Sequence, residues 1–98
     1  MNSETSATPM QPAPRLLRLS PEDNIAVAAT TIEAGQTLPC DGRTITVAMR
    51  IPTGHKVAIA PIAAGEKVFK YGAPIGSATC AIHPGQHVHS HNLKSDYF

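Results

Sequence analysis

Apolar and polar side chains alternate along this chain over short stretches, with the period of a β-strand. Residues 24–30 are the clearest case, since Ile25 and Val27 share one face and small alanines share the other. Further strands are predicted at residues 44–49, 57–60, 67–70 and 75–80. Nine prolines and seven glycines leave no window of about 11 residues with an unbroken helical period, which excludes long helices. We therefore predict an almost all-β fold.

One short pattern occurs four times: isoleucine, two residues, glycine, two residues, then leucine or valine. The copies cover residues 32–38, 51–57, 62–68 and 82–88. Glycine can take a positive φ at the third position of a type II turn, so each copy predicts a turn anchored by apolar residues. Asp41 and Gly42 predict a hairpin turn. Because the copies are unevenly spaced, they indicate turns joining the short strands of a folded-over, partly open barrel, and not a solenoid.

Composition limits the partners and the location of the protein. The chain has 98 residues, 15% charged side chains and a net charge of +1, without a basic run, so nucleic acid is not an expected partner. The absence of a long apolar segment and of a signal-peptide pattern predicts a cytoplasmic protein that does not bind membranes. Residues 1–14, rich in Ser, Thr, Pro and Gln, are expected to be disordered, residues 15–94 to form one domain, and residues 95–98 a tail.

Three of the five histidines stand within five residues near the C-terminus. Alternate side chains of a β-strand share one face at steps of about 6.6 Å, so His87, His89 and His91 would form a row on a predicted strand. Histidine titrates near neutrality and is the commonest metal ligand. The row therefore indicates metal binding or proton transfer, and a polar outer face of a C-terminal strand is the alternative.

Two further sets of polar residues are candidates for binding a substrate. His55 and Lys56 come directly after the Gly54 turn, where His55 could donate to a substrate hydroxyl and Lys56 could pair with a carboxylate. Lys70 could hold an anion as a point charge, and Tyr71 could orient it. The alternatives are an exposed polar turn for the first pair and a core position for Tyr71.

Three motifs stand in the same order as in a known enzyme family. They are IPTGHKVA at residues 51–58, KYGAPIG at residues 70–76 and HVHSHN at residues 87–92. Residues 21–27 and the turn at residues 32–35 also fit. In these motifs, and over residues 16–93, the chain resembles the N-terminal domain of the altronate and galactarate dehydratases. Each motif alone is weak, but three in order with matching spacing are specific.

The resemblance implies a fold and an activity. The fold is the SAF-type β-clip, named for sialic acid synthases and antifreeze proteins. The activity is that of a hydro-lyase, which dehydrates a sugar acid such as altronate or galactarate to a 2-keto-3-deoxy acid with a divalent metal, usually Fe²⁺, with Mn²⁺ as the other candidate. Single-polypeptide members carry a much larger catalytic domain, so we expect this chain to be a small subunit beside a large catalytic subunit. The small subunit of sulfolactate sulfo-lyase, which eliminates sulfite from a hydroxy acid, is similar too and remains an alternative.

Such chemistry gives the polar residues candidate roles. Removing a proton beside a carboxylate and expelling hydroxide from the next carbon requires positive charge and a proton donor or Lewis acid. We therefore assign His87 and His89 as metal ligands or acid–base groups, and His55 as a catalytic group. The candidate substrate-binding residues are Lys56, Lys70, Tyr71, His91 and Asn92. The remaining alternative is a non-catalytic SAF binding or assembly module, which would not require the histidines.

Overall fold

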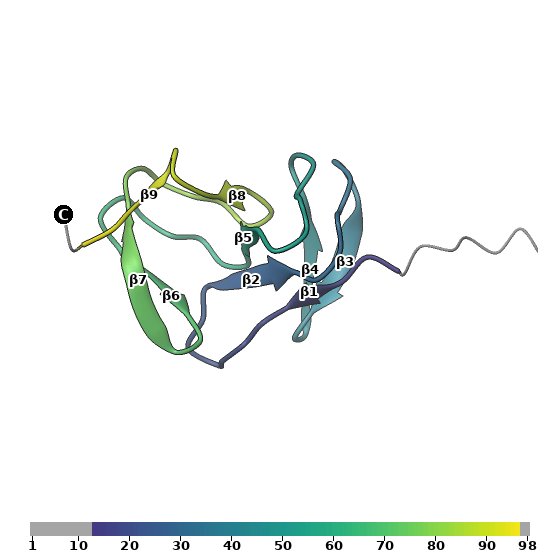
Figure 1. Ribbon diagram of the computed structural model, residues 1–98, viewed down its shortest axis with the longest axis horizontal. Helices are drawn as coiled ribbons and strands as arrows, with labels where there is room; N and C mark the ends of the chain where they lie inside the picture. The colour runs from purple at the N-terminus through teal and green to yellow at the C-terminus, as the bar shows by residue number, and fades with distance from the viewer. Residues whose placement is uncertain (1–12, 97–98) are drawn as a thin grey trace, which may run out of the picture.

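The secondary structure consists of β-strands, as the sequence predicts. The computed structural model describes residues 13–96, which form nine strands and no helix (Figure 1). The strands are β1 (Leu16–Leu17), β2 (Ile25–Ala28), β3 (Thr37–Cys40), β4 (Arg43–Thr46), β5 (Lys56–Ala58), β6 (Lys67–Lys70), β7 (Ala73–Ala78), β8 (His87–Val88) and β9 (Leu93–Lys94). Within this part of the chain there is accordingly no helix that could cross a membrane. All but the last two residues of the predicted disordered segment 1–14 lie outside the described residues.

The strands form three antiparallel sheets that are not closed into a barrel. The central sheet has the order β1-β2-β5-β8. A two-stranded sheet of β3 and β4 and a three-stranded sheet of order β6-β7-β9 lie at the right and left of Figure 1. The molecule is therefore a small fold of short, folded-over strands with open sheets.

The two outer sheets belong to two halves of the chain that have the same arrangement of a hairpin and a pair of bridged isoleucines. In the first half, Ile32 pairs with Ile51 through the backbone, and the β3–β4 hairpin lies between them in sequence. In the second half, Ile62 pairs with Ile82 in the same way around the β6–β7 hairpin. Each of these isoleucines begins one copy of the repeated pattern, so the four copies combine as two pairs.

The predicted type II turns are confirmed in all four copies. The residue after each repeat glycine donates its N–H to the carbonyl three residues earlier, at 2.9–3.1 Å. The glycines occupy the third turn position with φ between 86° and 92°, which a residue with a side chain rarely adopts. They are Gly35, Gly54, Gly65 and Gly85.

Two hydrophobic clusters pack on opposite faces of the central sheet. In β2, Ile25 belongs to one cluster, and Ala26 and Ala28 belong to the other. The same alternation holds in β5, where Val57 and Ala58 point to different clusters. Both faces of these strands are therefore buried, which explains their small residues.

β3 is a strand that was missing from the sequence prediction, because Pro39 interrupts the alternating pattern. Proline cannot donate a backbone hydrogen bond and is tolerated mainly in edge strands. β3 pairs with β4 alone, with Pro39 opposite Thr44, so one edge of β3 is unpaired. Pro39 is therefore tolerated in β3, whereas in a central strand it would remove a hydrogen bond between strands.

Asp23 is a buried carboxylate that holds the β6–β7 turn. It is 2% exposed, and its two oxygens accept hydrogen bonds from the backbone N–H groups of Tyr71 and Gly72, both at 2.8 Å. Both turn residues have positive φ, 59° at Tyr71 and 78° at Gly72, as in a type I′ turn. Positive φ is unfavourable for a bulky residue such as tyrosine. The carboxylate therefore stabilises a turn that Tyr71 itself disfavours.

Replacing Asp23 with alanine is expected to lower the free energy of unfolding by about 2–4 kcal/mol, because two backbone donors lose a charged acceptor. Urea unfolding measures the loss. Glu22→Ala removes the exposed neighbouring carboxylate and is expected to change stability by less than about 0.5 kcal/mol. Equal losses in the two variants would contradict the role of Asp23.

Candidate functional site

The pairing of β5 with β8 brings distant histidines together. These strands are antiparallel, and Val57 stands opposite His87. Continuing this register by two residues sets His55 opposite His89, and alternate residues of a strand share a face. Side chains that lie 32 residues apart, such as His55 and His87, therefore meet on one face of the central sheet.

His55, His87 and His89 form what we call the histidine cluster. The ring centroids are 5.1 Å apart for His55 and His87, 5.0 Å for His55 and His89, and 5.2 Å for His87 and His89. A 2.9 Å hydrogen bond joins Nδ1 of His55 to Nε2 of His87. His87 is only 9% exposed, whereas His89 is exposed. The cluster is thus anchored at His87 and open to solvent at His89.

The prediction of one continuous strand over residues 87–91 is wrong. β8 ends at Val88, and the N–H groups of Asn92 and Leu93 both donate to the His89 carbonyl, at 3.1 and 2.9 Å. The resulting turn replaces an evenly spaced row and places the His91 ring 5.7 Å from the His87 ring. The third member of the cluster is instead His55, which comes from the neighbouring strand.

His55 differs from the equivalent residues of the other three copies in its side-chain contacts. The residue after the repeat glycine is Gln36, His55, Glu66 or Gln86. In the three copies with Gln or Glu, the side-chain Oε1 accepts a hydrogen bond from the backbone N–H three residues earlier, at 2.6–2.7 Å, and closes its own turn. The His55 ring contacts the other histidines instead. The difference is visible when the four copies are aligned, and it is the sequence signal that sets His55 apart.

The histidine cluster fits a divalent metal ion. One ring nitrogen from each of its three residues lies within 4.8 Å of the others. Imidazole nitrogens bind Zn²⁺ at about 2.1 Å, which sets neighbouring ligands roughly 3–3.5 Å apart, and imidazole also suits iron. Small side-chain rotations can close that difference. Three protein ligands also leave positions open, which is typical of catalytic metal sites.

Burial and neighbouring imidazoles control the charge of His87. Its pKa is lowered, first by burial and then by the positive charge that His55 and His89 would carry when protonated. Neutral imidazole is the form that binds metals. The environment therefore favours the ligand form of His87 at neutral pH.

The metal-free protein is expected to lose stability as the pH falls below about 6.5. The lowered pKa of His87 means that the unfolded chain, titrating near 6.5, binds a proton more readily than the folded protein, so acid favours unfolding. The loss grows until the pH passes the folded-state pKa. Thermal unfolding with a chelator between pH 8 and 5 should show a steeper fall in Tm for the wild type than for His87→Gln. Parallel Tm curves would exclude His87 as the cause.

The two candidate lysines form a separate group. Lys56 follows His55 in the chain, and its neighbours in register are Val27 and Val88, so it points to the other face of the central sheet. The pKa of Lys56 is lowered by burial and then by the positive charge of Lys70. Within residues 13–96 neither lysine forms an ion pair. Two neighbouring cations without an acidic partner suit a bound anion.

Tyr71 and Asn92 lie in different surroundings. Tyr71 is 76% exposed at the tip of the β6–β7 hairpin, so it does not fill the core and is accessible to a ligand or partner. Asn92 is 5% exposed, and its side-chain amide bonds to the backbone of His87 and His89. Its polar atoms are therefore already occupied inside the protein.

A hollow of about 180 Å³ borders the histidine cluster. Its lining combines residues of the β8 segment with two residues from the loop after β4: Ala48, Met49, Gln86, His87, His91 and Asn92. Met49, 47% exposed, was not among the predicted site residues, because a lone methionine outside a strand gives no sequence signal. The hollow offers space for a small ligand beside His87 and His91.

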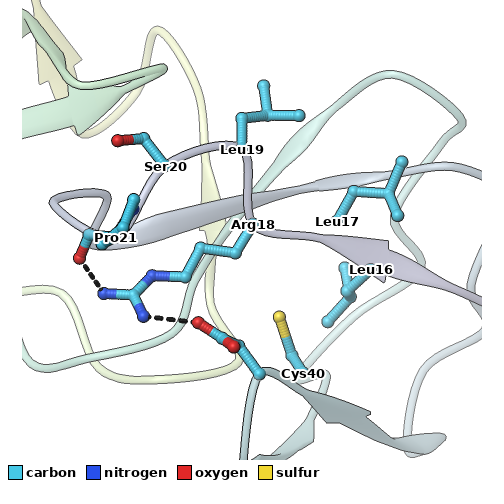
Figure 2. A pocket seen from close by; sticks show the side chains of 8 residues that line it. Leu16, Leu17, Arg18, Leu19, Ser20, Pro21 and Cys40 are labelled. Atoms are coloured by element: carbon cyan, nitrogen blue, oxygen red, sulfur yellow. Dashed lines mark hydrogen bonds and ion pairs between the residues drawn. The ribbon is translucent and has the colours of Figure 1, made fainter.

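A larger hollow of about 390 Å³ lies elsewhere, between β1 and the β3–β4 turn (Figure 2). Its charged groups are already paired, because the Arg18 guanidinium binds the Asp41 carboxylate at 2.6 Å and also donates to the Pro21 carbonyl. It is lined by Leu16, Leu17, Arg18, Leu19, Ser20, Pro21, Cys40 and Asp41. With no imidazole in its lining, it is a poorer candidate for catalysis than the smaller hollow.

Sequence comparison finds known proteins that are similar to this chain. Residues 14–96 match the family model described as the altronate/galactarate dehydratase SAF domain. The altronate dehydratase of Escherichia coli (strain K12) is 42% identical over 74 residues, which are 76% of this chain and 15% of that enzyme. The altronate dehydratase of Bacillus subtilis (strain 168) is 36% identical over 80 residues, 82% of this chain and 16% of that enzyme. The chain thus spans about one sixth of these enzymes.

A third relative is much closer to this chain in size. The (2R)-sulfolactate sulfo-lyase subunit alpha of Chromohalobacter salexigens is 40% identical over 75 residues, which cover 70% of this chain and 80% of that subunit. The family match extends over nearly all of the described residues and includes the histidine cluster. The chain therefore belongs to the altronate/galactarate dehydratase SAF domain family.

Proposed function

We propose that this domain acts as the small subunit of a metal-dependent lyase that dehydrates a sugar acid, such as altronate or galactarate, to a 2-keto-3-deoxy acid. The observation that carries the proposal is the histidine cluster, in which the β5 and β8 segments bring one ring nitrogen from each of three imidazoles within 4.8 Å of the others. The altronate dehydratase relatives support the reaction class. A large catalytic subunit completes the site, and the assembly works in the cytoplasm.

Dehydration of such an acid breaks a C–H bond beside the carboxylate and a C–O bond on the next carbon. A base takes the proton, the C–H electron pair forms the new double bond, and hydroxide leaves with the C–O electron pair. The resulting enol becomes the 2-keto acid when its hydroxyl loses a proton and the neighbouring carbon gains one. In this proposal His55, whose ring is hydrogen-bonded to His87 in the metal-free protein, gives a ring proton to the leaving oxygen.

The bound metal is proposed to be Fe²⁺, with Mn²⁺ as the alternative. His87 and His89 would hold it, and a ring nitrogen of His55 lies beside theirs, where it can serve as the proton donor. When bound, the ion supplies positive charge for the carboxylate side of the developing enolate and for the leaving hydroxide. The lowered pKa of His87 supports this role, because it favours the neutral ligand.

The remaining candidate residues are proposed to bind the acid. Lys56 and Lys70 provide two neighbouring cations for a carboxylate, and Tyr71 is accessible next to Lys70. His91 lines the 180 Å³ hollow and could contact the substrate there.

A second candidate function is that of a sulfolactate sulfo-lyase subunit. It is favoured by the subunit alpha relatives from Chromohalobacter salexigens and Paracoccus pantotrophus, of which the matches cover 80% and 76%. Sulfite would then leave in place of hydroxide, from the carbon next to the one that loses its proton. The same histidine cluster would serve both reactions.

The test is a lyase assay on this chain purified together with its candidate large subunit. Altronate, galactarate and sulfolactate are supplied with and without Fe²⁺, and both 2-keto acid and sulfite are measured. We expect metal-dependent 2-keto acid from altronate or galactarate that is lost when this chain is omitted. Sulfite release would select the second function. A large subunit that turns over equally well alone would indicate a non-catalytic binding or assembly module.

A further inference from the structure

Asn92 is a buried side chain bonded to the backbone that carries two members of the histidine cluster. It is 5% exposed. Its Nδ2 donates to the His87 carbonyl at 2.8 Å, and its Oδ1 accepts from the His89 N–H at 2.9 Å. These two backbone groups flank Val88 on the free edge of β8, where no further strand of the central sheet follows. The amide of Asn92 therefore takes the place of a neighbouring strand.

This contact fixes the direction of both rings. β8 is only two residues long, and its other edge is held by β5 through the pairs Lys56 with Val88 and Val57 with His87. Beyond Val88 the chain turns, and residue 89 is held on two sides: its carbonyl accepts from the N–H groups of Asn92 and Leu93, and its N–H donates to the Asn92 side chain. The rings of His87 and His89 are stacked at an interplanar angle of 10°. Without Asn92, the edge of β8 would have no side-chain support at these two residues.

We propose that Asn92 is the positioning residue of the histidine cluster, holding the backbone of His87 and His89 so that their rings meet His55. It does not need to touch substrate for this role, in contrast to the substrate-binding role that the sequence suggested. This proposal adds a positioning residue to the proposed metal site. It rests on that site only for the metal titration described below, and the proton-exchange measurement does not depend on it.

Asn24 provides a matched control within the same chain. Its Nδ2 donates to the Lys67 carbonyl at 3.0 Å, and its Oδ1 accepts from the Phe69 N–H at 2.9 Å. The two groups flank Val68 just as those bonded by Asn92 flank Val88. Asn24→Ala therefore removes the same kind of contact from a strand that carries none of the cluster's histidines. A merely structural role for Asn92 predicts the same consequences for both alanine variants.

The first measurement is made on the metal-free chain. In NMR spectra of the imidazole nitrogens, the proton shared by His55 and His87 is expected to be protected from exchange with water in the wild type and in Asn24→Ala. We expect at least a tenfold loss of that protection in Asn92→Ala. Protection that stays within twofold of the wild type in Asn92→Ala would overturn the proposal.

The second measurement is a calorimetric titration with Zn²⁺, a redox-inert metal that imidazole binds. Loss of a residue that orients metal ligands typically costs 10–100-fold in affinity, which is the decrease expected for Asn92→Ala and not for Asn24→Ala. Equal affinities of the two variants would overturn the proposal. Failure of the wild type to bind Zn²⁺ would count against the metal centre itself, and proton exchange would then decide the role of Asn92 alone.

Asn92→Asp covers the case in which Asn92→Ala does not fold. The aspartate keeps the acceptor for the His89 N–H but lacks the donor for the His87 carbonyl. We expect an intermediate degree of exchange protection in Asn92→Asp. The upper reference is the wild type, and the lower reference is His55→Ala, which lacks the His55–His87 bond. Wild-type protection in Asn92→Asp would contradict the need for the donor.

Discussion

His89→Ala is expected to lower the lyase activity of the reconstituted enzyme by more than about 100-fold while the domain stays folded. Mutating even the partners of a metal ligand typically costs 10–100-fold, so loss of a ligand should exceed that. His89 is exposed and lies in a turn outside β8, so its ring contributes little to the core. Initial rates at saturating Fe²⁺, with circular dichroism of the isolated chain, measure the two effects separately.

His83→Ala is the matched control for this prediction. His83 is also exposed and precedes a turn, but it lies outside the histidine cluster. We expect its activity to remain within about twofold of the wild type, as for most surface substitutions away from a site. Near wild-type activity in His89→Ala would remove this residue from the proposed site, and a loss of fold in His89→Ala would show that its role is structural.

Gly85→Ala is expected to lower the free energy of unfolding by more than about 3 kcal/mol, from overpacking together with backbone strain. A Cβ at residue 85 would lie 2.0 Å from the Thr46 carbonyl oxygen, which belongs to the backbone and cannot swing away as a flexible side chain could. The φ of 92° adds strain for any residue with a side chain. Because Gln86 and His87 follow directly, the variant should also weaken Zn²⁺ binding. Urea unfolding and the Zn²⁺ titration are the measurements.

Gly35→Ala separates the close contact from the backbone conformation. Gly35 has nearly the same φ, 86°, in the same kind of turn, but a Cβ there would meet nothing within 4 Å. Only the cost of the positive φ applies, about 1–2 kcal/mol. If both glycine variants lost the same stability, the contact with Thr46 would not be the cause.

Much of the fold follows from local patterns. Turn chemistry is local, so the glycine repeats and the Asp41–Gly42 dipeptide predicted their turns correctly. Alternation at Ile25 to Ala28 predicted a strand for the same reason. Pro39 hid β3, because the sequence cannot tell an edge strand from a loop before the sheet partners are known. Strand pairing is the non-local part of the fold.

In the candidate site, too, the residue types were predictable from the sequence but their arrangement in space was not. The row of histidines at 87, 89 and 91 was visible as residue types, but its geometry was not, because the chain turns after Val88. Lys56 stands beside His55 in the sequence and yet points to the other face of the sheet. Neighbours in sequence are thus separated by strand alternation, which applies only once the strand and its register are known.

The sequence by itself determined the all-β class, the turns, the four repeats and the family motifs, because each depends on residues that are close along the chain. Only the tertiary structure decided which histidines meet. The register that sets Val57 opposite His87 also brings His55 to His87 and His89. A shift of one residue would turn His55 to the opposite face. That register depends on burying Val57 and Ala58 in two different clusters at once, and this is a property of the packed molecule.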